Sequence, residues 1–146
     1  MQKEGRIVAY STEFSRAISI SLLINEKMEE HGFEFVSAKT IAEFLKIPTP
    51  TVVRILRSLN AAGLTTTKEG AKGGVLLGKP IEEITLLDIF LAVEHSSLFK
   101  MDIDFLIEDP RIDTLKLLIS NYMQDAEIAM KESLKKTTLA DIYKSL

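Results

Sequence analysis

The chain has 146 residues, of which 46% are hydrophobic and 27% charged, and its formal net charge is −3. This length fits one domain, or a small domain with a dimerising element, and the composition excludes a disordered, collagen-like or low-complexity chain. The chain has no cysteine, which excludes disulfides, zinc–thiolate sites and thiol nucleophiles. The longest apolar run, residues 17–24, is too short to span a bilayer and lacks a signal-peptide pattern, so we expect a cytoplasmic protein.

The charge is distributed unevenly along the chain. Residues 37–79 contain seven basic and two acidic side chains, a net charge of +5, whereas the rest of the chain carries −8. A basic segment inside an acidic protein is typical of a localised contact with a polyanion. A solvated surface rich in lysine would give the same pattern, so the charge alone leaves both interpretations open.

Three helices are predicted before residue 64. The first runs from a cap at Ser11 or Thr12 to about residue 30, and the second covers residues 39–45 behind a cap at Ser37. In the third, Thr49 supplies a capping hydroxyl ahead of proline at the first helical position, and the helix runs to about residue 62. Its inward face consists of Val52, Ile55, Leu56 and Leu59, and its outward face of Thr51, Arg54, Arg57 and Ser58.

A β-hairpin is predicted directly after the third helix. Residues 64–68 are rich in β-branched side chains, residues 75–77 form a second short apolar run, and the connection between them is rich in glycine. Two helices joined by a tight turn and followed by a hairpin make a winged helix-turn-helix.

The second half of the chain contains two predicted capping boxes. Thr85 and Asp88 start a helix that runs to about residue 94, and Thr138 and Asp141 start a short terminal helix. Residues 96–110 between them are expected to form a loop, with one helical turn around residues 105–106.

A long helix is predicted over about residues 113–135. At about 35 Å it is too long to be hidden by a small domain, so we expect it to pair with a second copy of the chain. Packing against the chain's own first helix is the alternative. The side chains that recur at helical spacing, and are therefore expected at a dimer interface, are Leu115, Leu118, Ile119, Tyr122, Ala126 and Ala129.

The sequence contains no pattern that indicates an enzyme or a metal site. His31 and His95 are the only histidines and do not have zinc-binding spacing. Residues 73–80 match most of a phosphate-binding loop, but Pro80 stands where the motif needs a hydroxyl for magnesium. No nucleophile and base are paired, so we predict a protein that is not an enzyme and has no cofactor.

The predicted winged helix supplies a candidate interface for double-stranded DNA. Arg54 is the expected base-reading residue because a guanidinium group pairs bidentately with guanine. The helix that begins at Ser37 can hold a phosphate through its N–H groups. The full set of candidate DNA-binding residues is Ser37, Lys39, Thr49, Thr51, Arg54, Arg57, Lys68 and Lys72.

Several motifs together resemble the Rrf2 family of bacterial winged-helix transcription regulators. They are IAE (41–43), IP (47–48), LNAAGL (59–64), GAKGG (70–74), ITLLDI (84–89), AVE (92–94) and TLADI (138–142). The resemblance covers nearly the whole chain. It implies a homodimer joined largely through the long helix, which binds a palindromic operator and usually represses transcription.

The chain departs from the family pattern at three places. Many members hold an iron–sulfur cluster through three cysteines in the loop after the residue 94 helix, and here residues 96–110 contain none, which places the chain in a cysteine-free branch. The arginine that often precedes the wing glycine is Glu69, which would repel the phosphates of a narrow minor groove. The usual wing tyrosine is Val75, which we expect only to pack.

These observations predict a mainly α fold with a small β-hairpin. Residues 1–95 are expected to form the winged helix-turn-helix domain, and residues 96–146 the loop, the long dimerisation helix and the terminal helix. The predicted function is a sequence-specific, DNA-binding transcription regulator, a homodimeric repressor whose effector, a small molecule or a protein, the sequence does not identify. The alternative is a winged-helix module that binds proteins in a regulatory complex and does not bind DNA directly.

Overall fold

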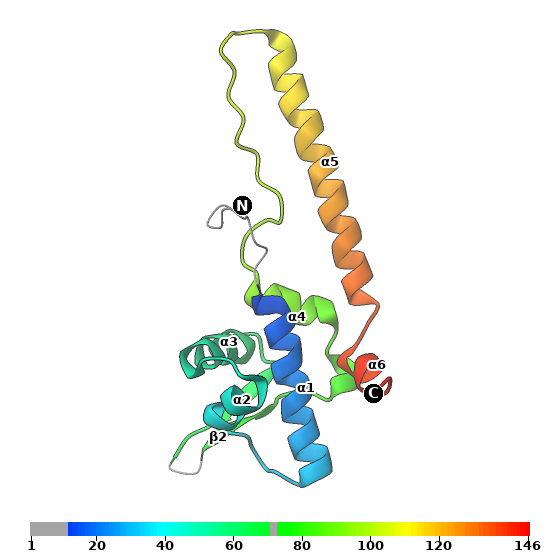
Figure 1. Cartoon of the computed structure of the whole chain (residues 1–146). Coiled ribbons are helices and arrows are strands. Elements are labelled where there is room, and N and C mark those ends of the chain that lie inside the picture. Colours follow the sequence, from blue (N-terminus) through cyan, green and yellow to red (C-terminus); the bar gives the residue numbers. More distant parts are fainter. Residues whose placement is uncertain (1–11, 71–72) are drawn as a thin grey trace, which may run out of the picture.

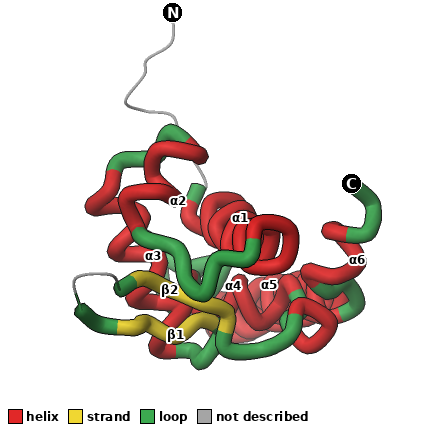
Figure 2. Tube along the Cα trace, turned by 90° about the horizontal axis from the view of Figure 1, so that it is seen from below, coloured by secondary structure: helices red, strands yellow, loops and turns green. Residues whose placement is uncertain are grey.

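Helix α1 lies at the centre of the fold, with α2 and α3 on one side and α6 on the other (Figures 1 and 2). The computed structural model describes residues 12–70 and 73–146. The elements are α1 (Glu13–His31), α2 (Ala38–Leu45), α3 (Thr49–Ala61), β1 (Thr65–Lys68), β2 (Gly74–Leu77), the 3-10 helix η2 (Ile81–Glu83), α4 (Leu86–Val93), α5 (Pro110–Lys135) and α6 (Leu139–Tyr143). The predicted winged helix-turn-helix, mainly α with one hairpin, is therefore confirmed.

The core is formed where the apolar faces of α1, α3 and α4 meet. The four residues predicted for the inward face of α3 are all buried. They meet Ile20 and Ile24 of α1 and Ile89 of α4, none of which is exposed to solvent. Each such side chain contributes roughly 1.5–3 kcal/mol when it is fully buried, so this core fixes the angle at which α3 is presented.

Most of the predicted caps are present. The Ser37 hydroxyl accepts a hydrogen bond from a backbone N–H of α2, and the capping boxes of α4 and α6 are complete. The cap at Thr49 is wrong, because Thr49 is itself the first residue of α3 and Pro48 precedes it. The carbonyl of Pro48 accepts the N–H groups of Thr51 (3.0 Å) and Val52 (3.1 Å), so the backbone closes this turn one residue earlier. At α1, Thr12 makes no side-chain cap, and Ser11 lies outside the described residues.

The wing is a two-stranded antiparallel hairpin that is anchored to the start of α2. Thr65 pairs with Leu77 at its base, and Lys68 pairs with Gly74 at the other end. Val36 adds an isolated bridge to Val75, with both backbone hydrogen bonds at 2.8 Å. A Cβ atom on Gly74 would lie 2.6 Å from the Val36 carbonyl oxygen, so only glycine allows this close approach.

Helix α5 extends away from the winged helix, and residues 96–109 run alongside it (Figure 1). The helix begins at Pro110, three residues before the predicted start, because the Asp109 carboxylate accepts the Arg111 N–H at 2.8 Å. The helical turn expected at residues 105–106 is wrong, since this segment contains only a bend. A side-chain contact holds the segment instead, because Glu127 of α5 accepts the N–H of Leu98 at 2.9 Å.

The end of the chain returns to the winged helix. Thr138 forms an isolated bridge with Thr85, and the Leu139 N–H donates to the Ile84 carbonyl at 2.9 Å. Leu139 is fully buried in the main core. The Tyr143 hydroxyl donates to Glu26 (3.3 Å), and burial together with the nearby carboxylates raises the pKa of this phenol. The segment that follows α5 thus contacts both the start of α4 and helix α1.

Candidate nucleic-acid interface

The polar face of α3 forms the centre of the candidate interface. The side chains of Thr49, Arg54 and Arg57 are exposed, and those of Thr51 and Ser58 are half-buried at the border with the core. Arg54 and Arg57 occupy the side of the helix opposite the buried residues Val52, Ile55, Leu56 and Leu59, and Thr49 is exposed at the first residue of the helix. The structure therefore makes Thr49, Arg54 and Arg57 of the predicted set accessible, as a recognition helix requires.

The beginning of α2 adds a second part of this surface. Ser37 accepts the Thr40 N–H at 3.1 Å and donates its own hydroxyl hydrogen to the Thr40 side chain at 2.9 Å. The Ser37 hydroxyl therefore has both its donor and its acceptor function satisfied by Thr40. The other N–H groups in the first turn of α2 are the ones available to a phosphate. Lys39 lies exposed in this first turn.

Arg54 is held by a residue that sequence reasoning did not single out. Its Nε donates to a carboxylate oxygen of Glu13 at 3.1 Å, and one terminal nitrogen donates to the same oxygen. Glu13 is in the first turn of α1, 41 positions earlier in the chain. No local pattern in the sequence signals this pair, because it depends on how α1 and α3 cross.

Arg57 lies one turn further along α3, next to a different element. Together with His95 and Leu91 it lines a surface hollow of about 340 Å³ between the end of α3 and α4. This places Arg57 beside α4.

The wing supplies one described cation and one described anion. The Lys68 ammonium lies 5.4 Å from the centre of the Phe35 ring, which keeps the charge beside the hairpin. Glu69 is exposed next to it. Lys72, the other wing cation of the predicted set, lies outside the described residues.

Asn60 connects α3 to the wing and was not predicted as a functional residue. Its side-chain amide donates to the Thr67 hydroxyl and accepts from the Thr65 hydroxyl. Because both threonines belong to β1, these two hydrogen bonds set the angle between the recognition helix and the hairpin. The sequence contained only an indirect signal, since Asn60 falls within the LNAAGL motif.

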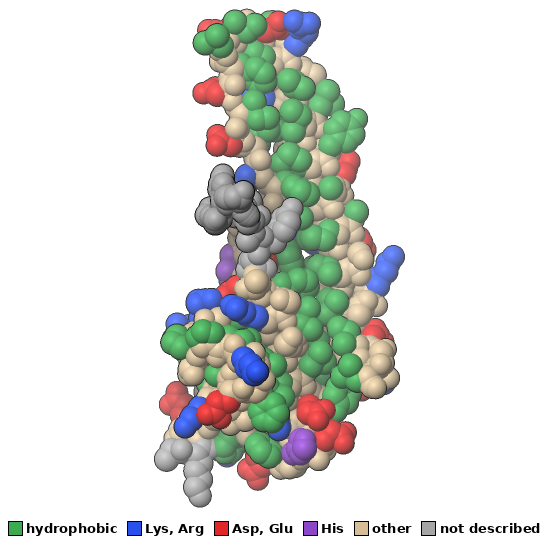
Figure 3. Space-filling model, viewed as in Figure 1, with side chains coloured by type: hydrophobic (Ala, Val, Ile, Leu, Met, Phe, Trp, Pro, Cys, Tyr) green, Lys and Arg blue, Asp and Glu red, His purple; other side chains and the backbone are tan. Residues whose placement is uncertain are grey.

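Helix α5 carries an apolar stripe that the described chain leaves uncovered. None of its residues is buried, and hydrophobic side chains form a band along it (Figure 3). Of the predicted interface residues, five are exposed and only Ile119 is half-buried. With 3.6 residues per turn, Leu115, Leu118 and Tyr122 lie about a quarter of a turn round the helix from Ile119 and Met123. These last two are half-buried, and Met123 lines a hollow shared with the loop.

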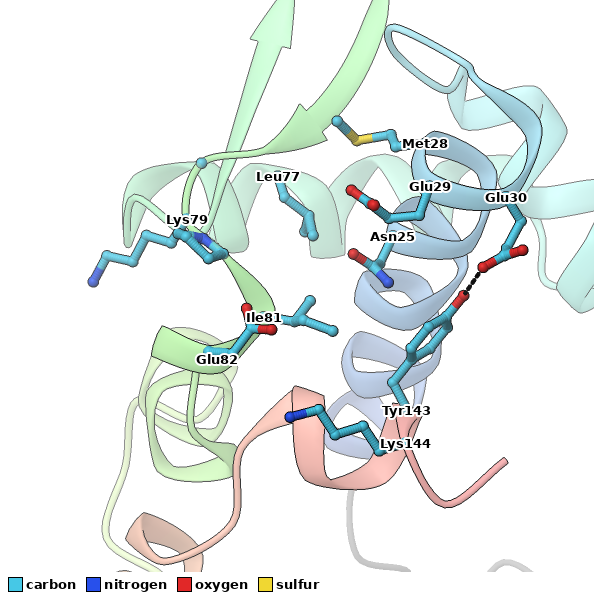
Figure 4. A pocket seen from close by; sticks show the side chains of 12 residues that line it. Asn25, Met28, Glu29, Glu30, Leu77, Lys79, Ile81, Glu82, Tyr143 and Lys144 are labelled. Atoms are coloured by element: carbon cyan, nitrogen blue, oxygen red, sulfur yellow. Dashed lines mark hydrogen bonds between the residues drawn. The ribbon is translucent and has the colours of Figure 1, made fainter.

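A cavity of about 590 Å³ lies away from α3, between α1, the segment after β2, and α6 (Figure 4). Asn25 and Glu29 face it from α1, and Leu77 and Ile81 face it from the opposite side. The buried Asn25 amide nitrogen has no hydrogen-bond partner among the described residues. The cavity adjoins residues 77–82, the segment that leads out of the wing.

Other chemistry is not assembled in the part of the chain that the structure describes. Over residues 12–70 and 73–146, no three His, Asp or Glu side chains gather in a way that could hold a metal ion. Within the same ranges, no helix has both the length and the apolar character needed to cross a membrane.

Comparison with known proteins connects this geometry to one family. A family model described as "Rrf2: Iron-dependent Transcriptional regulator" matches residues 10–145. YwgB of Bacillus subtilis (strain 168), assigned as an HTH-type transcriptional regulator, is 32% identical over 79 residues, which are 54% of this chain and 49% of YwgB. The chain thus spans about half the length of this curated relative.

Solved structures with the same fold extend the similarity over almost the whole chain. CymR (YrzC), the global cysteine regulator of B. subtilis, is 25% identical with a TM-score of 0.67, covering 96% of this chain and 99% of CymR. IscR of T. potens is 23% identical with a TM-score of 0.68, covering 97% of this chain and 90% of IscR. The winged-helix architecture, including α5, is therefore shared with these structures.

Proposed function

The chain belongs to the Rrf2 family of transcriptional regulators, and on this basis we propose that it is a cytoplasmic homodimer that binds an inverted-repeat operator in double-stranded DNA and represses transcription without an iron–sulfur cluster. The family consists of regulators, so the chain is a regulator and not an enzyme. We propose a cytoplasmic location because the proposed partner is chromosomal DNA.

The observation that carries the proposal of specific DNA binding is the exposed polar face of α3. Thr49, Arg54 and Arg57 are accessible on a helix whose opposite face is locked into the core. The major groove admits such a helix, and its base edges are read by side chains of this kind. Lys39 at the start of α2 and Lys68 on the wing flank this helix and would contact the backbone phosphates.

The support for a homodimer comes from α5. Its 26 residues correspond to a helix about 39 Å long, and none of them is buried by the chain itself. The exposed stripe of Leu115, Leu118, Tyr122, Ala126 and Ala129 lies on one side of the helix, and pairing with a second copy would cover it. A two-fold dimer would place two α3 helices in successive major grooves about 34 Å apart.

The family description mentions iron, and the residues of this chain do not fit a cysteine-bound cluster. The chain has no cysteine at all, whereas a cluster of the expected type needs three thiolates in residues 96–110. The acidic side chains of this loop do not converge into a set that could replace them, as judged over the described residues. The proposed regulation therefore does not involve a cysteine-bound iron cluster.

Two observations favour the alternative of a protein-binding module. Glu69 is exposed on the wing, where it would face phosphates, and the residues outside 37–79 are strongly acidic. A module of this kind would bind a partner protein through its acidic body and would show no steep loss of DNA affinity with salt.

Substitution of Arg54 tests the proposed function. We expect Arg54→Ala to cost roughly 1–3 kcal/mol in operator affinity and to relax the base preference at one position in each half-site. Fluorescence anisotropy with a selected operator and with single-base variants measures both effects. Unchanged affinity together with unchanged base preference would refute the assignment of α3 as the reading helix.

A further inference from the structure

The pair formed by Glu13 and Arg54 lies in the candidate interface, and Glu13 has no role in the function proposed above. The Glu13 side chain is 22% exposed, and the Arg54 side chain is 57% exposed. The carboxylate is therefore sheltered at the crossing of α1 and α3, while the guanidinium group projects from it towards solvent. A sheltered acid that holds a projecting arginine is a geometry suited to presenting that arginine.

The hydrogen bonds use one defined edge of the guanidinium group. A single Glu13 oxygen accepts from Nε and from one terminal nitrogen, which occupies the side edge of the planar fork. Arginine has five N–H donors in a rigid plane, so the two parallel donors at the end of the fork stay available. These two donors match the N7 and O6 acceptors of guanine, whereas adenine offers one acceptor and one donor.

We propose that Glu13 is a specificity-determining positioning residue, which holds the Arg54 guanidinium so that only its terminal edge faces the DNA and reads guanine. This inference rests on the proposed DNA-binding function. Without Glu13, the long arginine side chain samples other rotamers and can contact a phosphate instead of a base. The negative charge of Glu13 also disfavours non-specific contact with the polyanion. Glu13 therefore favours the specific site and weakens binding to other DNA sequences.

The chain provides a matched control for the loss of this carboxylate. Glu29 lies on the same helix, 16 residues further along, or about 24 Å by the helical rise, and lines the cavity on α1 away from α3. Glu13→Ala and Glu29→Ala therefore remove the same charge from the same helix. Glu13→Gln is the second variant, which keeps the shape of the side chain at the crossing if the alanine variant folds poorly.

The experiment uses the full-length protein and a duplex selected by the wild type from a random library. The guanine whose preference Arg54→Ala relaxes is replaced by 7-deazaguanine, which lacks the N7 acceptor. The measured quantity is the dissociation constant for the 7-deazaguanine duplex divided by that for the unmodified duplex. This ratio is determined for each variant at two salt concentrations. We expect Glu13→Ala to lower this ratio by about twofold to fivefold, since an exposed ion pair contributes modestly, and Glu29→Ala to leave it unchanged.

The same ratio shows whether Glu13 acts through Arg54. In the Arg54→Ala background, adding Glu13→Ala should produce no further change in the ratio. An unchanged ratio in Glu13→Ala and Glu13→Gln would overturn the proposal, and a raised ratio would show that Glu13 competes with the base for Arg54. A wild-type protein that selects no duplex would overturn the proposed function itself, and the role of Glu13 with it.

Discussion

Leu118 is the position where the proposed dimer interface is tested most sharply. It lies between Leu115 and Tyr122 in the exposed stripe on α5, and the residue is 47% exposed. Full burial of a leucine is worth roughly 1.5–3 kcal/mol, so covering the remaining half contributes about 0.7–1.4 kcal/mol per copy. Because a two-fold interface contains each residue twice, Leu118→Ala should weaken the dimer by up to about 1.4–2.8 kcal/mol, or roughly tenfold to 100-fold in the dimer dissociation constant.

Leu117 provides the matched control for this substitution. It is the same residue type, is 60% exposed and is adjacent in the chain, but it points about 100° further round the helix, away from the stripe. Sedimentation equilibrium of the wild type, Leu118→Ala and Leu117→Ala gives the three dissociation constants. If Leu117→Ala weakened the dimer while Leu118→Ala did not, the assigned face of α5 would be refuted.

Three further predictions follow from other parts of the chain. Lys72→Ala should weaken binding about equally for all DNA sequences and lower the salt slope by about 0.9 per lost phosphate contact, as salt titrations would show. Thr85→Ala should lower the free energy of unfolding by about 0.5–2 kcal/mol in urea melts, because it removes the cap that Asp88 completes on α4; no loss would mean that the capping box does not stabilise the fold. The hydrogen bond from Leu98 and the nearby Lys131 lower the pKa of Glu127. The stability that this carboxylate confers on the loop is thus full above its usual pKa and is lost as the pH falls through the lowered value. The protection factors of residues 96–109, which compare each amide's hydrogen exchange with its intrinsic rate at the same pH, should therefore fall in acid, and should show no such fall in Glu127→Gln.

The parts of the fold that were predictable from sequence are those fixed by neighbouring residues. The caps at Ser37, Thr85 and Thr138 each need a hydroxyl and a backbone N–H three positions away, and the two capping boxes add a carboxylate at that same position. The inward face of α3 follows from helical spacing alone. The error at Thr49 has the same local origin, because a proline on each side makes two starting positions for the helix equally acceptable in sequence.

The parts that were not predictable depend on segments that are distant in the chain. The Glu13–Arg54 pair spans 41 positions, and the return of Leu139 to the core depends on the path of α5. The bridge between Val36 and Val75 likewise forms only once the hairpin packs against the start of α2. The candidate DNA-binding residues could be identified by type and helical face, whereas the partner that orients Arg54 could not.

Selection of genomic DNA fragments by the purified full-length protein, sequenced at two salt concentrations, tests the central claim most directly. The account predicts enrichment of an inverted repeat whose half-sites are one helical turn apart, with affinity that falls steeply as salt rises. A folded dimer that enriches no sequence, with binding insensitive to salt, would contradict the account and favour the protein-binding module.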